Sequence, residues 1–226
     1  MDEQPGAAHV ADTARPAPVL RSPLAQVFER LDPPAQAARA GVQVAEWADV
    51  ACLVVRGHRD DGVLMAAVAS VFNLNLPLRP STWVATDGAV ALWMSPDEWW
   101  ILLPRVTRDV MMHQLARLLE GRFCQLVDIS GSFSCLRLAG PDALTVLRHL
   151  SPYDVQAMPT DACVSTVVHK AQLTLVRTDD QGIMLIVRRS FAPWIWRLIT
   201  AGARPYGLAR CAPAQLPAGP FSTLLG

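Results

Sequence analysis

The sequence lacks an excess of charge of either sign. Its 226 residues carry 20 Lys and Arg against 20 Asp and Glu, so the formal net charge is zero. Proteins that bind nucleic acids or anionic membranes through electrostatics carry a positive excess or a basic patch. The composition therefore predicts neither a nucleic acid nor a membrane as a partner.

Long apolar runs and paired cysteines are also missing. No run approaches the roughly 20 apolar residues that cross a bilayer, and the acidic Asp2 and Glu3 stand where a secretory leader has basic residues. The five cysteines are odd in number, widely spaced and without a Cys-x-x-Cys pair. Such cysteines are typical of reduced core residues, so we expect a cytoplasmic protein without a dedicated metal site.

The common catalytic motifs are absent as well. The sequence has no Gly-x-Gly-x-x-Gly, no Gly-x-Ser-x-Gly and no His-Glu-x-x-His. Ser130-Gly131-Ser132 has no helix signal after it and no assigned His partner, so we interpret it as an ordinary turn. A lone histidine at a strand end, such as His169, is more typical of a hydrogen-bonded bystander than of a general base. We therefore predict no catalytic, cofactor-binding or metal-binding residues on this chain.

What the sequence does contain is apolar. Hydrophobic residues make up 51% and charged residues only 18%. A large core would account for these numbers, and so would a surface that is buried against other subunits. Composition leaves both explanations open.

The order of the expected elements divides the chain into four parts. Residues 1–21 are rich in Ala, Pro and polar residues without periodicity and predict a flexible tail. Residues 22–130 form a first unit, with strands expected at 50–55, 83–85, 89–93, 98–103 and 123–127 and helices after Asp60-Asp61 and Thr107-Arg108-Asp109. Residues 131–203 repeat this order, with strands at 135–138, 165–168, 172–178 and 182–187 and helices over 143–150 and from Ser190, as N-cap, to Thr200. Residues 204–226 contain four prolines and predict an extended tail.

Two successive βαββ-type units predict the fold class. Short strands joined by tight turns favour antiparallel pairing, and each unit contributes amphipathic helices. We expect an α+β protein with mainly antiparallel sheets that are covered by helices on one face.

Two segments combine charged turns with clustered aromatic residues. Residues 95–100 and 188–196 together hold four of the seven tryptophans. Adjacent strand residues point to opposite faces, so Asp97 and Glu98 are not spaced as a glycosidase dyad. We interpret Asp97 as a turn residue and Glu98 as the partner of a basic side chain. Of Trp99 and Trp100, one is expected to face the core and the other to face outward.

The second segment is expected to form an amphipathic helix. Phe191, Trp194 and Ile195 share a stripe at helical spacing, and Trp196 falls nearly opposite Trp194. One face of this helix is predicted to pack into the core. The additional tryptophan is either a second core contact or an interface residue, since tryptophan is enriched at binding hot spots.

These segments resemble the gamma subunit of heterotetrameric sarcosine oxidase. The resemblance runs from Ser22-Pro23-Leu24 to about Ala201, and its characteristic pieces occur in order: Arg56-Gly57, residues 92–99 (Leu-Trp-Met-Ser-Pro-Asp-Glu-Trp), Asp128-Ile129-Ser130 and residues 189–192 (Arg-Ser-Phe-Ala) with a following tryptophan. Each piece alone is weak, whereas the combination in this order is specific.

A more distant resemblance is to the folate-binding aminomethyltransferase fold of the glycine cleavage system. It is carried by residues 128–130, by residues 138–143 (Leu-Ala-Gly-Pro-Asp-Ala) and by Tyr153-Asp154-Val155. That fold then has a Gly-Gly turn with an acidic residue for the one-carbon chemistry. Residues 168–172 (Val-His-Lys-Ala-Gln) have neither the glycines nor the acid. The resemblance therefore implies the scaffold without a folate-dependent site of its own.

The resemblance implies a role inside an oxidoreductase complex that oxidatively demethylates sarcosine to glycine with folate-linked one-carbon capture. Its partners would be the alpha, beta and delta subunits, principally the aminomethyltransferase-like part of alpha. FAD, FMN, NAD, zinc and tetrahydrofolate would be held by those subunits, with no cofactor on this chain. Two alternatives are a subunit of a related N-methyl amino acid oxidase or dehydrogenase and a stand-alone folate-binding protein of the same fold.

Overall fold

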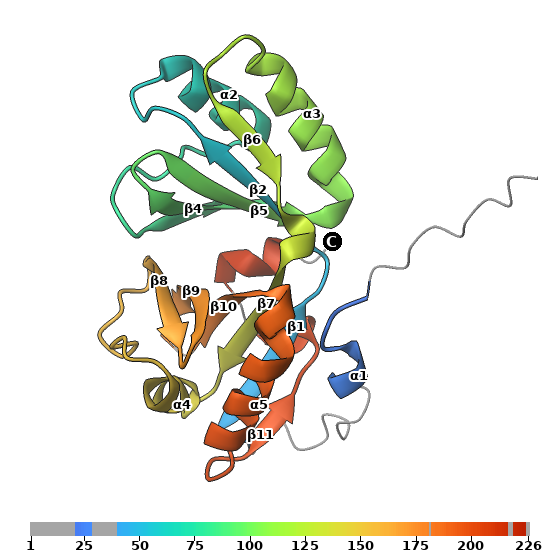
Figure 1. The fold of residues 1–226 in the computed structure, drawn as a ribbon, viewed down its shortest axis with the longest axis vertical. Coiled ribbons are helices and arrows are strands. Elements are labelled where there is room, and N and C mark those ends of the chain that lie inside the picture. The colour runs from blue at the N-terminus through green and yellow to red at the C-terminus, as the bar shows by residue number, and fades with distance from the viewer. Residues whose placement is uncertain (1–20, 29–39, 181, 217–218, 225–226) are drawn as a thin grey trace, which may run out of the picture.

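Two β-sheets stacked between two pairs of helices make up the chain (Figure 1). The computed structural model describes residues 21–28, 40–180, 182–216 and 219–224. The five-stranded sheet has the order β3 (Trp83–Thr86), β4 (Ala89–Ser95), β5 (Glu98–Pro104), β2 (Val50–Arg56), β6 (Gln125–Asp128). The six-stranded sheet has the order β11 (Leu208–Arg210), β1 (Val42–Trp47), β7 (Phe133–Ala139), β10 (Gly182–Arg188), β9 (Ala171–Asp179), β8 (Cys163–Val168).

Each sheet carries two helices on its outer face. The five-stranded sheet packs against α2 (Gly62–Phe72) and α3 (Arg108–Leu118), and the six-stranded sheet packs against α4 (Ala143–Leu150) and α5 (Ala192–Gly202). A short α1 (Ala25–Phe28) precedes β1. A third apolar cluster joins the inner faces of the two sheets. The predicted α+β class with mainly antiparallel sheets and helices on one face is confirmed.

Local sequence signals account for many of the element boundaries. The carboxylate of Asp61 caps α2 by accepting hydrogen bonds from the backbone N–H groups of Val63 and Leu64. Gly88 has a φ of +90° in the Asp87-Gly88 turn between β3 and β4, a conformation that favours glycine. The predicted N-cap at Ser190 is wrong, because residues 189–191 form a 3-10 turn, η4 (Arg189–Phe191), and α5 begins after it.

The two sheets are related by an approximate internal two-fold repeat. The strand order β3-β4-β5-β2-β6 of one sheet matches β8-β9-β10-β7-β1 of the other. In each sheet, the fifth strand runs antiparallel to the fourth: β6 pairs with β2, and β1 pairs with β7. Because β1 leads directly into β2, and β6 leads into β7 through η3 (Ser130–Ser132), both connections cross from one sheet to the other.

Strand pairing divides the chain differently from the expected boundary at residues 130 and 131. The strand β1 lies within residues 22–130 but pairs with β7 and β11 of the six-stranded sheet. Its residues Val42 and Val44 are fully buried in the core beneath α4 and α5. Strand pairing between distant segments depends on contacts that local periodicity does not contain, which is why the sequence did not indicate it.

The expectation of an extended tail over residues 204–226 is wrong. Within it, β11 pairs in parallel with β1, and the 3-10 segments η5 (Pro213–Gln215) and η6 (Gly219–Leu224) follow. Phe221 and Leu224 are buried in the cluster between the sheets. Apolar side chains at the end of the chain thus complete the core despite the prolines. The predicted flexible tail lies outside the described residues except for Arg21.

Candidate functional site

The turn between β4 and β5 gathers its charges around one arginine. Arg56 Nη2 lies 3.1 Å from Asp97 Oδ2, and its Nε lies 3.4 Å from Glu98 Oε2. Ser95 Oγ donates to Asp97 Oδ1 at 2.7 Å, and this hydrogen bond together with Arg56 lowers the pKa of Asp97. Asp97 is thus a turn residue and Glu98 meets a basic side chain, as predicted. Both carboxylates nevertheless reach the same guanidinium, because Asp97 precedes the strand.

The two neighbouring tryptophans of β5 point to opposite faces, as predicted. Trp99 is fully buried beneath α2 and α3, and its Nε1 donates to the carbonyl of Pro77 at 2.8 Å. Trp100 is half-buried and faces the six-stranded sheet, where its ring lies 4.9 Å from that of Phe133. Trp100 Nε1 also donates to Glu98 Oε1 at 2.9 Å. The sequence segment 95–100 therefore joins the turn to the contact between the sheets.

The helix α5 places its aromatic residues in different surroundings. Ile195 and Trp196 are buried, and the ring of Trp196 meets that of Phe28 edge-on at 4.9 Å. Trp194 is half-buried, with its ring 5.9 Å from that of His169. Phe191 is 43% exposed. The additional tryptophan is predicted to be either a second core contact or an interface residue, and Trp196 is a core contact. Phe191 and Trp194, which share a stripe with Ile195, reach the surface.

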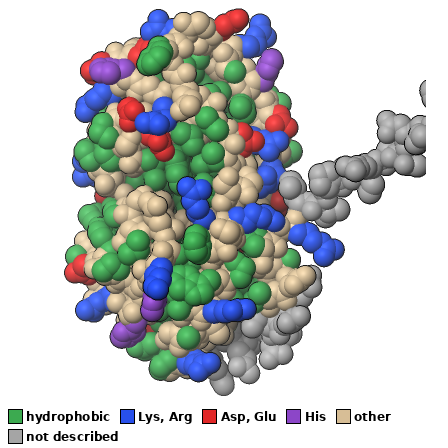
Figure 2. Space-filling model, in the orientation of Figure 1, with side chains coloured by type: hydrophobic (Ala, Val, Ile, Leu, Met, Phe, Trp, Pro, Cys, Tyr) green, Lys and Arg blue, Asp and Glu red, His purple; other side chains and the backbone are tan. Residues whose placement is uncertain are grey.

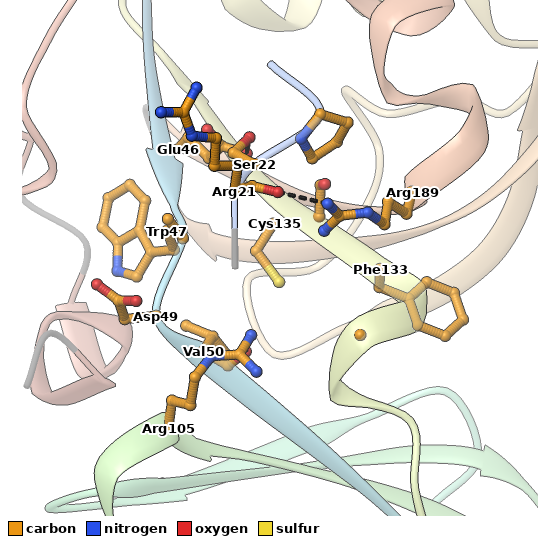
Figure 3. Close-up of a pocket in the computed structure, with 14 residues that line it drawn as sticks. Arg21, Ser22, Glu46, Trp47, Asp49, Val50, Arg105, Phe133, Cys135 and Arg189 are labelled. Carbon is orange, nitrogen blue, oxygen red and sulfur yellow. Dashed lines mark hydrogen bonds between the residues drawn. The ribbon is translucent and has the colours of Figure 1, made fainter. Parts of the chain in front are cut away.

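A pocket of about 100 Å³, which we call the junction pocket, lies where the chain crosses between the sheets (Figure 3). Arg105 and Arg189 line it from opposite sides. They occupy equivalent positions of the internal repeat, since each is the first residue of the 3-10 turn, η2 (Arg105–Thr107) or η4, that follows β5 or β10. The other residues that line the pocket come from three segments, 21–23, 46–50 and 131–135.

Three charged groups of this pocket, Arg105, Arg189 and Glu46, have partners within the chain. Arg105 Nη2 donates to the carbonyl of Val50 at 3.2 Å, and Arg189 donates to the carbonyl of Arg21. Ser22 Oγ donates to Glu46 Oε1 at 2.5 Å, while burial raises the pKa of Glu46. The pocket therefore ties the N-terminal segment and the two crossing connections together.

The buried thiols and Ser130 are not placed or ionised as catalytic nucleophiles are. Burial raises the pKa of the Cys135 and Cys163 thiols to about 12 and that of Cys52 well above its usual range. These thiols remain protonated and unreactive at neutral pH. Ser130 Oγ accepts from the backbone N–H of Cys52 at 3.0 Å and donates to Asp128, so it stabilises a turn. Among residues 21–28, 40–180, 182–216 and 219–224, no group of three or more His, Cys, Asp or Glu residues is placed to hold a metal ion.

Sequence reasoning missed two features of the interior. The junction residues Glu46, Arg105 and Arg189 are far apart in sequence, and only the internal repeat signals that the two arginines are equivalent. Arg137 lies in β7 and is 1% exposed, with its Nη2 2.6 Å from Asp179 Oδ2. No sequence signal distinguished this arginine from a solvated one.

Surface charge is mixed over the face shown in Figure 2, where basic and acidic side chains are interspersed with hydrophobic ones. No helix in the described part of the chain is long and apolar enough to cross a membrane.

The family model and the related proteins that match this sequence all point to the same family. The sequence model of the sarcosine oxidase gamma subunit family matches residues 56–204. The sarcosine oxidase subunit gamma of Corynebacterium sp. (strain P-1) is 30% identical over 177 residues, which cover 76% of this chain and 84% of that protein. The subunit of the same name from Arthrobacter sp. is 29% identical over 147 residues, covering 62% and 71%.

Solved structures show the same fold. The heterotetrameric sarcosine oxidase from Corynebacterium sp. U-96, in complex with pyrrole 2-carboxylate, contains a chain that matches with a TM-score of 0.73 at 24% identity, covering 85% of this chain and 99% of that one. Aminomethyltransferase T of the glycine cleavage system from Bartonella henselae matches with a TM-score of 0.59 at 12% identity, covering 76% and 48%. The chain belongs to the sarcosine oxidase gamma subunit family.

Proposed function

We propose that this chain is the non-catalytic gamma subunit of a heterotetrameric sarcosine oxidase, an enzyme that oxidatively demethylates sarcosine to glycine. The observation that carries the proposal is the match of the gamma subunit family model to residues 56–204, which span most of both sheets. The activity belongs to the assembly, and this chain contributes structure to it.

The contacts of the polar groups support a structural role. A catalytic acid, base or nucleophile needs an unengaged group with a suitable pKa in a cavity open to substrate. Glu98 is held by Arg56 and Trp100, while Arg105 and Arg189 bind backbone carbonyls. Their partners lie within the chain itself, so these groups stabilise turns and crossing connections. FAD, FMN, NAD and zinc would then reside on the alpha, beta and delta subunits.

The principal partner in this proposal is the aminomethyltransferase-like part of the alpha subunit, which also binds tetrahydrofolate and captures the one-carbon unit. The gamma chain shares the fold of an aminomethyltransferase but has a different turn between β8 and β9. His169, with a φ of +52°, and Lys170 form that turn, which carries no carboxylate. A chain with this turn supports a neighbour's folate chamber better than it forms one.

We place the assembly in the cytoplasm. The cysteines at positions 52, 124, 135, 163 and 211 are all free thiols, and reduced buried cysteines are typical of that compartment.

Co-expression with the open reading frames adjacent to its gene tests this function. A tag on this chain should purify a yellow, flavin-containing complex with three other chains that converts sarcosine to glycine. An active flavin complex that prefers another N-methyl amino acid would support the related-oxidase alternative. A colourless chain that purifies alone would contradict the subunit role, and tetrahydrofolate binding to it would then favour the stand-alone folate-binding protein.

A further inference from the structure

Large exposed hydrophobic side chains are frequent in the segment that runs from η2 through α3 to β6, the terminal strand of the five-stranded sheet. Among the described residues, nine such side chains are exposed. Five of them fall between the start of η2 and the end of β6, and we call these five the edge surface: Val106, Val110, Leu118, Phe123 and Val127. Phe123 is completely exposed at 103%, and Val106 is 81% exposed. Scattered apolar residues are ordinary on a protein surface, so the case for a contact with another protein rests on Phe123 and Val106, which are almost free of intramolecular cover, and on the open strand beside Phe123.

The backbone of β6 is open on the same edge. β6 is the terminal strand of its sheet, and in the described part of the chain it pairs with β2 alone. The N–H of Ile129 donates to the carbonyl of Cys52 at 2.9 Å. Hydrogen bonding in an antiparallel pair alternates along the strand, so the backbone groups of Leu126 and Asp128 point away from β2. Outward-facing N–H and C=O groups on an exposed edge are a template for another extended segment.

An apolar groove lies at the beginning of this edge. Its volume is about 580 Å³, and it is lined by Phe123, Cys124 and Gln125 together with residues 56–58 and Asp97. A groove next to an open strand edge can receive a side chain of a segment that pairs with the strand.

The charged side chains of β6 and of the groove lining are paired within the chain. Arg108 Nη1 lies 3.3 Å from Asp128 Oδ2, and Arg122 Nη2 lies 2.9 Å from Asp61 Oδ2. Arg56 is paired with Asp97 beside the groove. A highly charged partner would find no uncompensated counter-charge there, so the central part of the matching segment should be uncharged and apolar.

The internal repeat shows what such a segment looks like. The strand β1 occupies the position in the six-stranded sheet that β6 occupies in the five-stranded sheet, and its outer edge is covered by β11, which pairs with it in parallel from Val42–Leu208 to Val44–Arg210. In chain order β6 follows α3 as β11 follows α5, so β11 has no equivalent by position: among the residues described, no strand lies beyond β6 in the five-stranded sheet. The chain itself thus demonstrates that a strand of only three residues can dock in parallel at this position of the fold.

We propose that the edge of β6 binds a short, extended, uncharged segment of another subunit of the oxidase, which pairs with β6 in parallel and seats an apolar side chain in the groove beside Phe123. This proposal rests on the proposed function, because it takes its partner from the heterotetramer. It adds the location and the mode of the contact, which completes the five-stranded sheet as β11 completes the other.

A photo-cross-linking amino acid placed in the complex tests the location. The complex would be co-expressed with the cross-linker at position 123, at position 127 or at the control position 167. Val167 is a matched control for Val127, since both lie on terminal strands and their exposed fractions are 37% and 38%. Irradiation should join positions 123 and 127, but not 167, to another subunit of the complex. Mass spectrometry should place the cross-linked residues in an extended, uncharged stretch.

Charge insertion tests the energetics. Val127→Lys should reduce the amount of partner subunits that co-purify by roughly tenfold, whereas Val167→Lys should leave it unchanged. Circular dichroism of the two variant chains should match, because both residues are exposed.

The possible failures are distinguishable. If the tagged wild-type chain brings down no partner, the proposed function fails and this inference fails with it. If the wild-type complex forms but Val127→Lys assembles normally, or if position 167 cross-links as well as 127, only the assignment of the edge is overturned. A cross-link between two copies of this chain would also overturn it.

Discussion

The buried ion pair between Arg137 and Asp179 provides a sharp test of the energetics of the fold. Arg137 is 1% exposed on the central strand β7, whereas the Asp179 side chain is 35% exposed at the end of β9. The guanidinium also donates to Thr178, but its Nε has no hydrogen-bond partner among the described residues. It fits because position 182 is glycine, where a Cβ would collide with the guanidinium. The two partners therefore differ in how well water can replace the interaction.

This difference predicts unequal effects of the two single substitutions. Asp179→Asn keeps the shape of the side chain but leaves a buried guanidinium without its counter-ion. We expect a loss of about 3 kcal/mol, the lower end of the range for breaking a buried pair, because one partner is partly hydrated. Arg137→Met removes the buried charge and its unsatisfied donor together, and the remaining carboxylate can hydrate. We expect a loss of about 1 kcal/mol or less.

Pulse proteolysis of the full chain in urea measures both free energies. With a slope of about 2–3 kcal/mol per molar urea, the midpoint of Asp179→Asn should fall by about 1 M and that of Arg137→Met by at most about 0.5 M. The double variant should resemble Arg137→Met, because its asparagine no longer faces a charge. Equal losses for the two single variants, or a larger loss for Arg137→Met, would refute this reasoning.

Three further predictions concern the junction, the C-terminal segment and the thiols. Burial raises the pKa of Glu46, so the ionisation of this carboxyl lowers the stability of the wild-type chain as the pH rises through the folded-state pKa. Glu46→Gln still accepts a hydrogen bond from Ser22 and should therefore gain stability relative to wild type from about pH 4.5 upward. Urea midpoints of the two proteins that stay parallel from about pH 4 to about pH 8 would contradict this. Phe221→Ala should lower the free energy of unfolding by about 3–5 kcal/mol, because the ring is fully buried between the sheets. Thermal unfolding of the assembled complex measures this loss. An unchanged Tm would show that the C-terminal segment does not stabilise the fold. Iodoacetamide should modify the half-buried Cys124 first and Cys135 only after unfolding, a sequence that mass spectrometry of timed samples can contradict.

The sequence predicted those elements whose signals are local. Asp61 caps α2, and the Asp87-Gly88 step forms the turn of the first hairpin, because a short side chain or a glycine determines the backbone there. The opposite orientations of Trp99 and Trp100 follow from strand periodicity. Such features need no knowledge of what packs against them.

The features that the sequence did not predict depend on distant contacts. The strand β11 has only three residues and is stabilised by its pairing with β1, so its own composition indicates a loop. Phe221 and Leu224 follow a proline-rich stretch and become core residues because the two sheets leave space between them. The position of Arg137 on an inner strand depends on Gly182 in the next strand. Each of these outcomes is decided by register between strands, which local patterns do not specify.

The candidate site also has features that could be predicted from local sequence and features that depend on distant contacts. The pairing of Glu98 with a basic residue could be predicted from the motif, whereas the identity of that residue as Arg56 follows from the β2–β5 register. The junction pocket and the edge surface could not be predicted, since each assembles segments from several elements.

The crossing connections also bear on what kind of subunit this chain can be. An enzyme that closes around a substrate needs a hinge between parts that open at low cost. Here β1 pairs with the six-stranded sheet and continues into β2, while β6 pairs with the five-stranded sheet and continues into β7. Separating the sheets would expose the apolar cluster between them, including Trp47 and Phe221. We therefore expect the two halves to move as one body, which is what the proposed structural role beside another subunit requires.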